Sequence, residues 1–357
     1  MSARSLLSRG ASFSSVGALA PLGGGSTTGR KLGFSYCGVS FSSLGALAPL
    51  GGILGKVGLL ALFAATLAQA ETYYVTVAGL GGEQEFEQRF SGWAKDIDKI
   101  LRATPGASVT TLYGPDATKA KLTSALRDVA GKAKKDDAVV LMIIGHGTFD
   151  GSDYKMNLPG PDMSGVELAT LLDRIPARQL VVNMTSASGG SFAALQKENR
   201  AVITATKSGT EKNATIFARY WVEALRDPAA DTDKSESVSA LEAFKYAEQK
   251  TAKFYETNNR LATEHAVLED TGKGEPTKNP SPQNGQGLLA ARISLLQLGT
   301  GRSAAAGNPE LLKRKQEIEE KIDNLKYQKA AMQVADYRKQ LADLLTQLAK
   351  VQAELDK

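Results

Sequence analysis

The chain has 357 residues, of which 42% are hydrophobic and 23% charged, a balance typical of a globular protein and not of a collagenous or wholly disordered one. Of its 43 basic residues five lie in residues 1–70, which contain no acidic residue, so 38 basic residues face 38 acidic ones in the remainder. We therefore expect no nucleic-acid partner, because nucleic-acid binders keep a cationic surface that neutralises phosphates.

Residues 1–52 form a low-complexity extension rich in glycine and serine. The segment 13–24 recurs almost unchanged as residues 41–52. So few large side chains cannot bury enough apolar surface to offset the entropy of ordering the chain. We expect no fold here, and we favour a region upstream of the true start codon over a targeting extension.

Residues 53–70 have the order of a secretory signal peptide. Lys56 precedes an apolar stretch, and Ala68-Gln-Ala70 follows it. The apolar stretch is short for a membrane span of about 20 residues. We predict cleavage after Ala70, an exported protein located in a bacterial periplasm or secreted, and no membrane span after cleavage.

The single cysteine, Cys37, lies in the extension. The exported chain would then contain none. Disulfides, thiolate metal sites and cysteine catalysis are excluded there.

Residues 71–300 alternate between short apolar runs and amphipathic helical stretches. Strands are predicted at 73–78, 108–113, 138–144, 179–183 and 201–206, and helices at 85–103, 118–135, 165–175 and 191–197. Repeated βα units predict an α/β domain with a mostly parallel sheet and helices on both faces. In such sheets the functional groups gather at the carboxyl ends of the strands.

The same domain is expected to continue past its last predicted strand. Residues 215–225 and 238–260 read as helices, and residues 271–287, rich in glycine, proline and asparagine, as a loop. Residues 287–298 are expected to pack back onto the domain.

Residues 308–357 form a separate helical segment. Two series of apolar residues recur every seven positions with a phase shift between them: Leu311, Ile318, Leu325 and Met332, then Leu341, Leu348 and Leu355. Such heptads predict a coiled coil that mediates self-association through residues 309–357, and the shift indicates a stutter or a helical hairpin. The alternative is a solvated helix folded against its own domain.

His146, one of two histidines, occupies a notable position. The apolar run 138–144 leads directly into Gly145-His146-Gly147, so the imidazole emerges at a strand end between two glycines. Glycines there allow a ligand to approach the backbone closely. Alone, a loop histidine is more often structural. The other, His265, is expected in a strand or the core, with a substrate-pocket role as the minority alternative.

Ser186 lies at a second strand end. The apolar run 180–183 leads into small residues and then a short helix, so this side chain is expected on the strand-to-helix turn, where free amides can surround a developing oxyanion. Taken alone, the stretch reads more readily as a Ser/Gly-rich helix cap.

The two elements together resemble the caspase-like clan of cysteine peptidases, most closely the legumain family. These proteins show a strand ending in Gly-His-Gly, then a helix, then a strand that leads into Asp/Glu-Ala-Cys-x-Ser-Gly. The corresponding stretch here is Met184-Thr185-Ser186-Ala187-Ser188-Gly189. The resemblance covers residues 73–298.

The resemblance implies a caspase-like fold and roles for three residues: His146 as the catalytic histidine, Gly147 as an oxyanion-hole amide and Ser186 at the nucleophile position. It also implies a peptide or protein substrate, cleaved without metal or organic cofactor. Two departures matter. Ser186 replaces the cysteine, and Met184 replaces an acid that helps to shape the specificity pocket of legumain-like enzymes. We expect little or no peptidase turnover, because a serine hydroxyl needs close general-base assistance that the histidine of this clan does not give.

Two alternatives stay open. A non-catalytic peptide-binding or scaffold protein would assemble through the C-terminal coiled coil. A Ser-His hydrolase would need a carboxylate to orient the imidazole, and Asp150 and Asp153 are the nearest in sequence.

Overall fold

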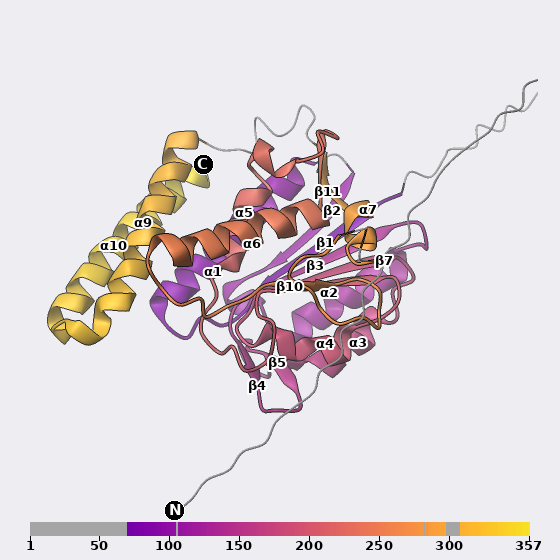
Figure 1. Cartoon of the computed structure of the whole chain (residues 1–357), viewed down its shortest axis with the longest axis horizontal. Coiled ribbons are helices and arrows are strands. Elements are labelled where there is room, and N and C mark those ends of the chain that lie inside the picture. The colour runs from indigo at the N-terminus through magenta and orange to yellow at the C-terminus, as the bar shows by residue number, and fades with distance from the viewer. Residues whose placement is uncertain (1–69, 105, 282, 284, 298–307) are drawn as a thin grey trace, which may run out of the picture. The chain divides into compact units, whose positions relative to one another are not determined.

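The computed structural model in Figure 1 describes residues 70–104, 106–281, 283, 285–297 and 308–357. The chain divides into two units, Met1–Ala65 and Thr66–Lys357, and the fold below is that of the second. The predicted extension, Cys37 and the predicted signal peptide up to residue 69 lie outside the described residues and stay predictions. None of the described helices is both long and apolar enough to cross a membrane.

A six-stranded sheet forms the centre of this unit, in the order β2-β1-β3-β7-β8-β10. Its strands are β1 (Thr72–Ala78), β2 (Ala107–Leu112), β3 (Ala138–Ile144), β7 (Arg178–Asn183), β8 (Arg200–Thr204) and β10 (Val267–Glu269). All neighbours pair in parallel except β10, which is antiparallel to β8. The predicted α/β class with a mostly parallel sheet is confirmed.

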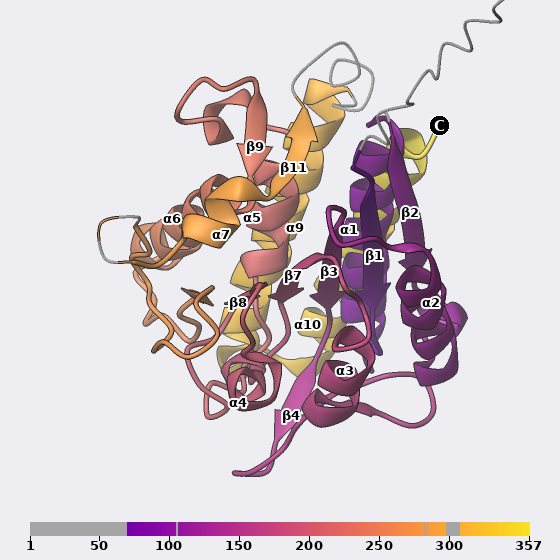
Figure 2. The ribbon, with the colours of Figure 1, turned by 90° about the vertical axis from the view of Figure 1, so that its right-hand side faces the viewer.

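Both faces of the sheet are covered, which explains why β3 is an unbroken apolar run. All seven of its residues are buried. Val140 and Met142 belong to the core that the sheet shares with α1, α5 and α6, whereas Leu141 and Ile143 belong to the core shared with α2, α3 and α4. A strand buried on both faces needs no polar alternation. Figure 2 shows helices on either side of the strands.

Seven helices surround the sheet in the described part of the chain. They are α1 (Gln84–Arg102), α2 (Lys119–Lys132), α3 (Gly165–Leu172), α4 (Phe192–Leu195), α5 (Phe217–Ala224), α6 (Ala240–Thr257) and α7 (Leu288–Arg292). Three of them, α2, α3 and α6, begin at a side chain that caps a free backbone N–H group. Ser164 and Glu167 form a capping box on α3, and Ser239 and Glu242 form one on α6. The helix predicted for 238–260 was too long, because residues before the α6 cap form a strand instead.

Two small sheets were not predicted. Strand β9 (Ser237–Ser239) pairs with β11 (Ser294–Gln297), and in this way residues 287–297 pack back onto the domain as predicted, while residue 298 lies outside the described residues. The other sheet directly follows His146 and consists of β4 (Gly147–Phe149), β5 (Tyr154–Met156) and β6 (Met163–Ser164). Strands this short carry no periodic signal.

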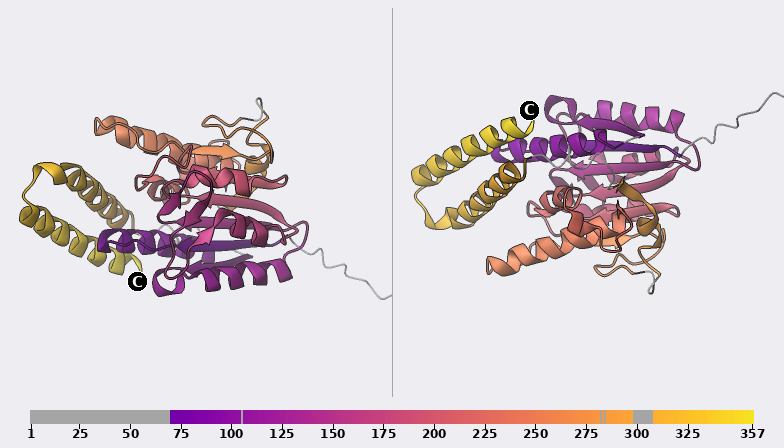
Figure 3. Two further views of the ribbon diagram at one scale, coloured as in Figure 1. Left: turned by 90° about the horizontal axis from the view of Figure 1, so that it is seen from below. Right: turned by 90° about the horizontal axis from the view of Figure 1, so that it is seen from above.

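The C-terminal segment is an antiparallel helical hairpin of α9 (Pro309–Gln328) and α10 (Val334–Leu355), which Figure 3 shows side by side. The predicted phase shift falls at the turn between the helices, so the hairpin alternative is confirmed. The apolar residues form one cluster between the two helices: Ile318, Ile322, Leu345, Leu348, Val351 and Leu355. Of the heptad residues, Ile318, Leu348 and Leu355 belong to this cluster, and Leu311 and Leu341 pack against it. Self-association stays a prediction.

Candidate functional site

The candidate site lies where β3 and β7 end. These strands are parallel neighbours, and Ile143 pairs with Asn183. The residues that follow them, Gly145-His146-Gly147 and Met184-Thr185-Ser186, therefore emerge at the same edge of the sheet. The topology brings together the two segments that the sequence singled out.

Ser186 is bonded directly to the backbone of Gly147. Its Oγ accepts a hydrogen bond from the Gly147 N–H at 3.0 Å and donates one to the Gly147 carbonyl oxygen at 3.0 Å. The serine is buried, with 3% of its surface exposed. The amide expected to stabilise an oxyanion and the side chain at the nucleophile position are in contact.

Glycine is required on both sides of His146, for different reasons. Gly145 has φ of +147°, in the region that favours glycine. At Gly147 the obstacle is space: a Cβ would lie 2.6 Å from the Ser186 carbonyl oxygen, 2.6 Å from the Tyr154 ring and 2.8 Å from Thr185 Oγ1. The close approach of the two segments depends on the missing side chain.

The imidazole of His146 is half-buried and lies against two rings of α1. Its centroid lies 4.6 Å from that of Phe86 and 5.1 Å from that of Phe90, in edge-on arrangements. Burial lowers the pKa of His146, and the nearby Lys326 ammonium lowers this pKa further. Three groups raise it by smaller amounts: the backbone of Gly81 and the carboxylates of Glu83 and Glu87. The neutral imidazole, the form that can accept a proton, is favoured.

Hydroxyl and imidazole do not form an activated pair. Among the described residues no hydrogen bond joins His146 to Ser186, and the Ser186 proton goes to the Gly147 carbonyl oxygen. A serine becomes a strong nucleophile only when a base takes its proton during attack. The observed arrangement does not provide that base.

A buried polar network holds the Ser186 turn, and the sequence did not reveal it. The Tyr154 hydroxyl on β5 donates to Asn183 Oδ1 at 3.2 Å and lies 2.6 Å from Thr185 Oγ1. Asn183 Nδ2 in turn donates to Ser191 Oγ at 3.2 Å. Tyr154 lies eight residues after His146, and this spacing indicates a contact with the Ser186 turn only once the β4–β5 hairpin is known.

His265 supports the same turn from a distance. Its Nδ1 lies 2.5 Å from Glu211 Oε1, and the Glu211 carbonyl oxygen accepts a hydrogen bond from Ala187 N–H at 2.8 Å. Ala187 has φ of +54°, unusual for a residue other than glycine. His265 precedes β10 and is partly exposed. It pairs with a carboxylate and is not a fully buried core residue.

Two further predicted positions have other surroundings than the sequence suggested. Asp150 Oδ1 accepts the N–H groups of Ser152 and Asp153 in the β4–β5 turn. This carboxylate closes its own turn and does not orient His146. The side chain of Met184, which stands where legumain-like enzymes have an acid, is 1% exposed and belongs to the apolar core that the sheet shares with α1.

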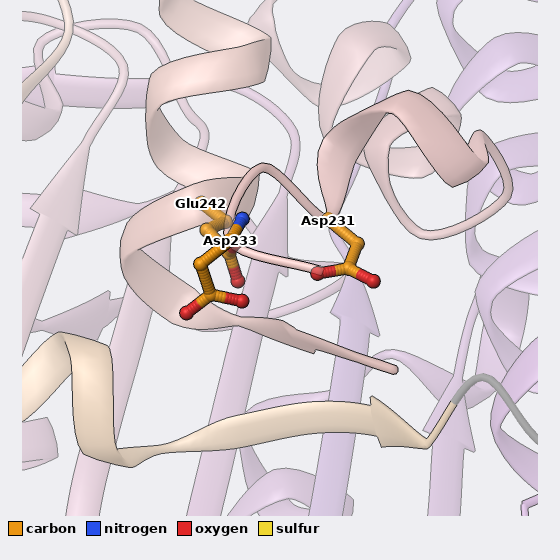
Figure 4. A group of neighbouring side chains, drawn as sticks. All are labelled: Asp231, Asp233 and Glu242. Carbon is orange, nitrogen blue, oxygen red and sulfur yellow. The ribbon is translucent and has the colours of Figure 1, made fainter. Parts of the chain in front are cut away.

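One group of carboxylates has the spacing of a cation site: Asp231, Asp233 and Glu242, drawn in Figure 4. Glu242 Oε1 accepts the N–H groups of Thr232 and Asp233, and both Asp231 oxygens accept N–H groups of the same loop. These bonds account for the cluster as a loop structure in front of the α6 cap.

No protein-family model matches the sequence, and the search of curated proteins found no match either. Among solved structures, the protein GSU0716 from Geobacter sulfurreducens is similar at 13% identity, over 64% of this chain and 99% of that one, with a TM-score of 0.41. Caspase-1 from Spodoptera frugiperda is similar at 12% identity over 57% and 87%, with a TM-score of 0.39. The Drosophila initiator caspase Dronc is similar at 10% identity over 58% and 81%, with a TM-score of 0.37.

Proposed function

We propose that residues 71–300 are a caspase-like peptidase domain of the legumain type in which Ser186 disables hydrolysis. One observation carries the proposal: Ser186 Oγ lies 3.0 Å from the N–H of Gly147, the residue next to His146, at the ends of adjacent parallel strands. A nucleophile position, a backbone amide beside it and an imidazole at one sheet edge are the parts that acyl transfer needs.

With a cysteine at position 186, each part has a role. The neutral His146 imidazole takes the thiol proton, the thiolate attacks the carbonyl carbon of the scissile peptide bond, and the electron pair of the C=O moves to oxygen. The Gly147 N–H stabilises that oxyanion. When the tetrahedral intermediate collapses, the C–N bond breaks and the imidazolium of His146 protonates the leaving amine. Water then hydrolyses the thioester and releases the acid.

With serine the first step fails. A thiol is partly ionised at neutral pH, whereas a serine hydroxyl requires a base at the moment of attack. The proton of Ser186 points to a carbonyl oxygen, which cannot accept it as a base. We therefore propose a peptide-binding cleft without turnover in this chain, which would bind peptides or proteins in an exported compartment.

The test is the variant Ser186→Cys in a Cys37→Ser background, where the introduced thiol is the only one. A peptide panel varied at the residue before the scissile bond is expected to show cleavage that an alkylating agent abolishes. The Ser186→Cys and His146→Ala double variant is expected to lose it.

Ser188→Cys is the matched control, because Ser188 lies on the same turn but its Oγ contacts Thr206 Oγ1 at 3.1 Å, away from Gly147. This variant should not cleave. A folded Ser186→Cys protein that cleaves no peptide, or cleaves equally well without His146, would refute the peptidase proposal.

The second candidate is a non-catalytic peptide-binding or scaffold protein. The observation that favours it is that the Ser186 hydroxyl already uses both its donor and an acceptor on Gly147. In that case the peptide panel would bind to the natural chain and to Ser186→Cys alike, and neither would cleave it.

A further inference from the structure

The first turns of α1 separate the His146 imidazole from the C-terminal hairpin. Phe86, on the first turn, packs edge-on against the imidazole. Lys326, near the end of α9, lies over the same Phe86 ring, with its Nζ 3.7 Å from the ring centroid. The Lys326 ammonium thus contacts the Phe86 ring, and the Phe86 ring contacts the His146 imidazole, although 180 residues separate Lys326 from His146 along the chain.

An ion pair with Glu85 also holds Lys326 in place. Its Nζ lies 3.3 Å from Glu85 Oε1, and Glu85 is buried with 1% of its side chain exposed. An ammonium over a ring face contributes about 0.5–2 kcal/mol, most when water is excluded. Together the two contacts hold the Phe86 ring between the hairpin and the imidazole.

The hairpin reaches this position through polar contacts rather than a shared apolar core. Its apolar residues cluster with one another, separately from the two cores of the sheet. Besides Lys326 on the Phe86 ring, its contacts with α1 include ion pairs and a hydrogen bond: Arg89 with Asp323 at 2.8 Å, Asp96 with Lys315 at 2.5 Å and Trp93 Nε1 with Glu319 at 3.1 Å.

Two solvent-open grooves border this interface. Their volumes are about 360 Å³ and 460 Å³, and both are lined by residues of α1 and of the hairpin. Charged groups with specific partners fix orientation and register more than they add stability. A docked element of this kind is suited to placing one side chain accurately.

We propose that Lys326 is a positioning residue for His146, acting through the Phe86 ring that it holds against the imidazole. The inference rests on the proposed function only for the catalytic role of His146. The contacts between Lys326, Phe86 and His146 hold whether or not His146 is catalytic.

The charge of Lys326 gives the contact a measurable signature. The ionisable groups that act on His146 are Lys326 from α9, Glu87 from α1 and Glu83 from the preceding loop. Lys326 is the cation among them, and it disfavours the imidazolium. Its removal should therefore raise the pKa of His146, whereas removal of a distant lysine should not.

The experiment is a pH titration of the imidazole C–H resonances by NMR, which the chain permits because it has only two histidines. Lys326→Met is expected to raise the pKa of His146, because it removes the cation that disfavours the imidazolium. The resonances of His265, which pairs with Glu211, serve as the internal reference. Lys326→Arg should behave like the natural chain, and Lys321→Met, on the exposed side of α9, is the matched control.

Four results would overturn the inference: an unchanged His146 titration in Lys326→Met, an equal change in His265, an equal effect of Lys321→Met, or an arginine that fails to restore the natural value. If Lys326→Met does not fold, Lys326→Arg and Phe86→Leu supply the test, because only the second should move the His146 resonances. Activity does not enter, so an inactive Ser186→Cys protein with a responsive His146 would refute the proposed function alone.

Discussion

Ser186 Oγ is bonded to both backbone polar groups of Gly147, accepting from its N–H and donating to its carbonyl oxygen at 3.0 Å each. The side chain at the nucleophile position therefore occupies the amide that would stabilise an oxyanion. A substrate carbonyl must displace this contact to use that N–H. The relationship accounts for both the resemblance to a peptidase site and the expected lack of turnover.

Gly147→Ala should destabilise the protein. The new Cβ would meet backbone and ring atoms of Ser186 and Tyr154 at 2.6 Å. Overpacking of this kind costs about 1–3 kcal/mol of the free energy of unfolding, measured by urea denaturation. Gly131→Ala is the control: that glycine lies in α2 with open space around its Cβ position, and alanine there should add about 0.5–1 kcal/mol. Equal effects of the two variants would contradict the close approach.

Tyr154→Phe should weaken the turn that carries Ser186. The hydroxyl is buried, and its removal leaves Asn183 and Thr185 short of a partner. A loss of about 1–3 kcal/mol in the free energy of unfolding is expected. Tyr113→Phe, at a residue with 38% exposure, should change it by less than about 0.5 kcal/mol. A neutral Tyr154→Phe variant would show that the network does not support the turn.

Glu264 should make stability depend on pH. Burial raises its pKa from 4.5 to about 7, although hydrogen bonds from Ile216 N–H, Tyr255 Oη and Phe217 N–H limit the rise. Between those values the folded state holds a proton that the unfolded state has lost. The stabilisation is therefore complete below about pH 4.5 and declines as pH rises through about 7, by roughly 3 kcal/mol in total.

The corresponding measurement compares the free energy of unfolding at several values between pH 5 and pH 8 for the natural chain and Glu264→Gln. The variant keeps the size of the side chain but cannot ionise. Its curve should be flatter by the amount that Glu264 contributes. Parallel curves would mean that Glu264 titrates normally.

Arg219→Met should loosen the hairpin. Arg219, with 4% of its side chain exposed, lies within 3.6 Å of both Glu319 and Asp323 on α9, and these carboxylates are buried. Removal of one partner of a buried ion pair costs about 3–5 kcal/mol. Amide hydrogen exchange in residues 309–355 should accelerate accordingly. Lys253→Met removes an exposed pair with Glu256 and should leave this exchange unchanged; equal exchange in the two variants would contradict ionic docking.

The long helices and strands were predictable because burial of one face gives a periodic pattern of apolar residues, and burial of both faces gives a continuous apolar run. Strand β3 begins and ends at the predicted residues, since seven consecutive apolar side chains fit a central strand and little else. The helix hairpin was one of the predicted alternatives because its heptads change phase at the turn. The strands of three residues or fewer, β4 to β6 among them, were missed for lack of any periodicity.

The site was predictable only in part. Strand ends pointed to His146 and Ser186, because carboxyl ends of parallel strands meet at one edge. The bond from Ser186 to Gly147 and the contact of Phe86 with His146 depend on side-chain directions that spacing does not determine. Lys326 lies so far along the chain that only the packing of the hairpin reveals its role.

The central claim, that position 186 and His146 share one site, is tested most directly by thiolate absorbance as a function of pH in Ser186→Cys, Cys37→Ser protein with and without His146→Ala. With His146 present more thiolate should form below the ordinary thiol pKa of about 8.5, because the neutral imidazole can take the thiol proton and the imidazolium so formed stabilises the thiolate. Without His146 its pKa should rise by about one or more. The same thiol pKa in both proteins would contradict a shared site.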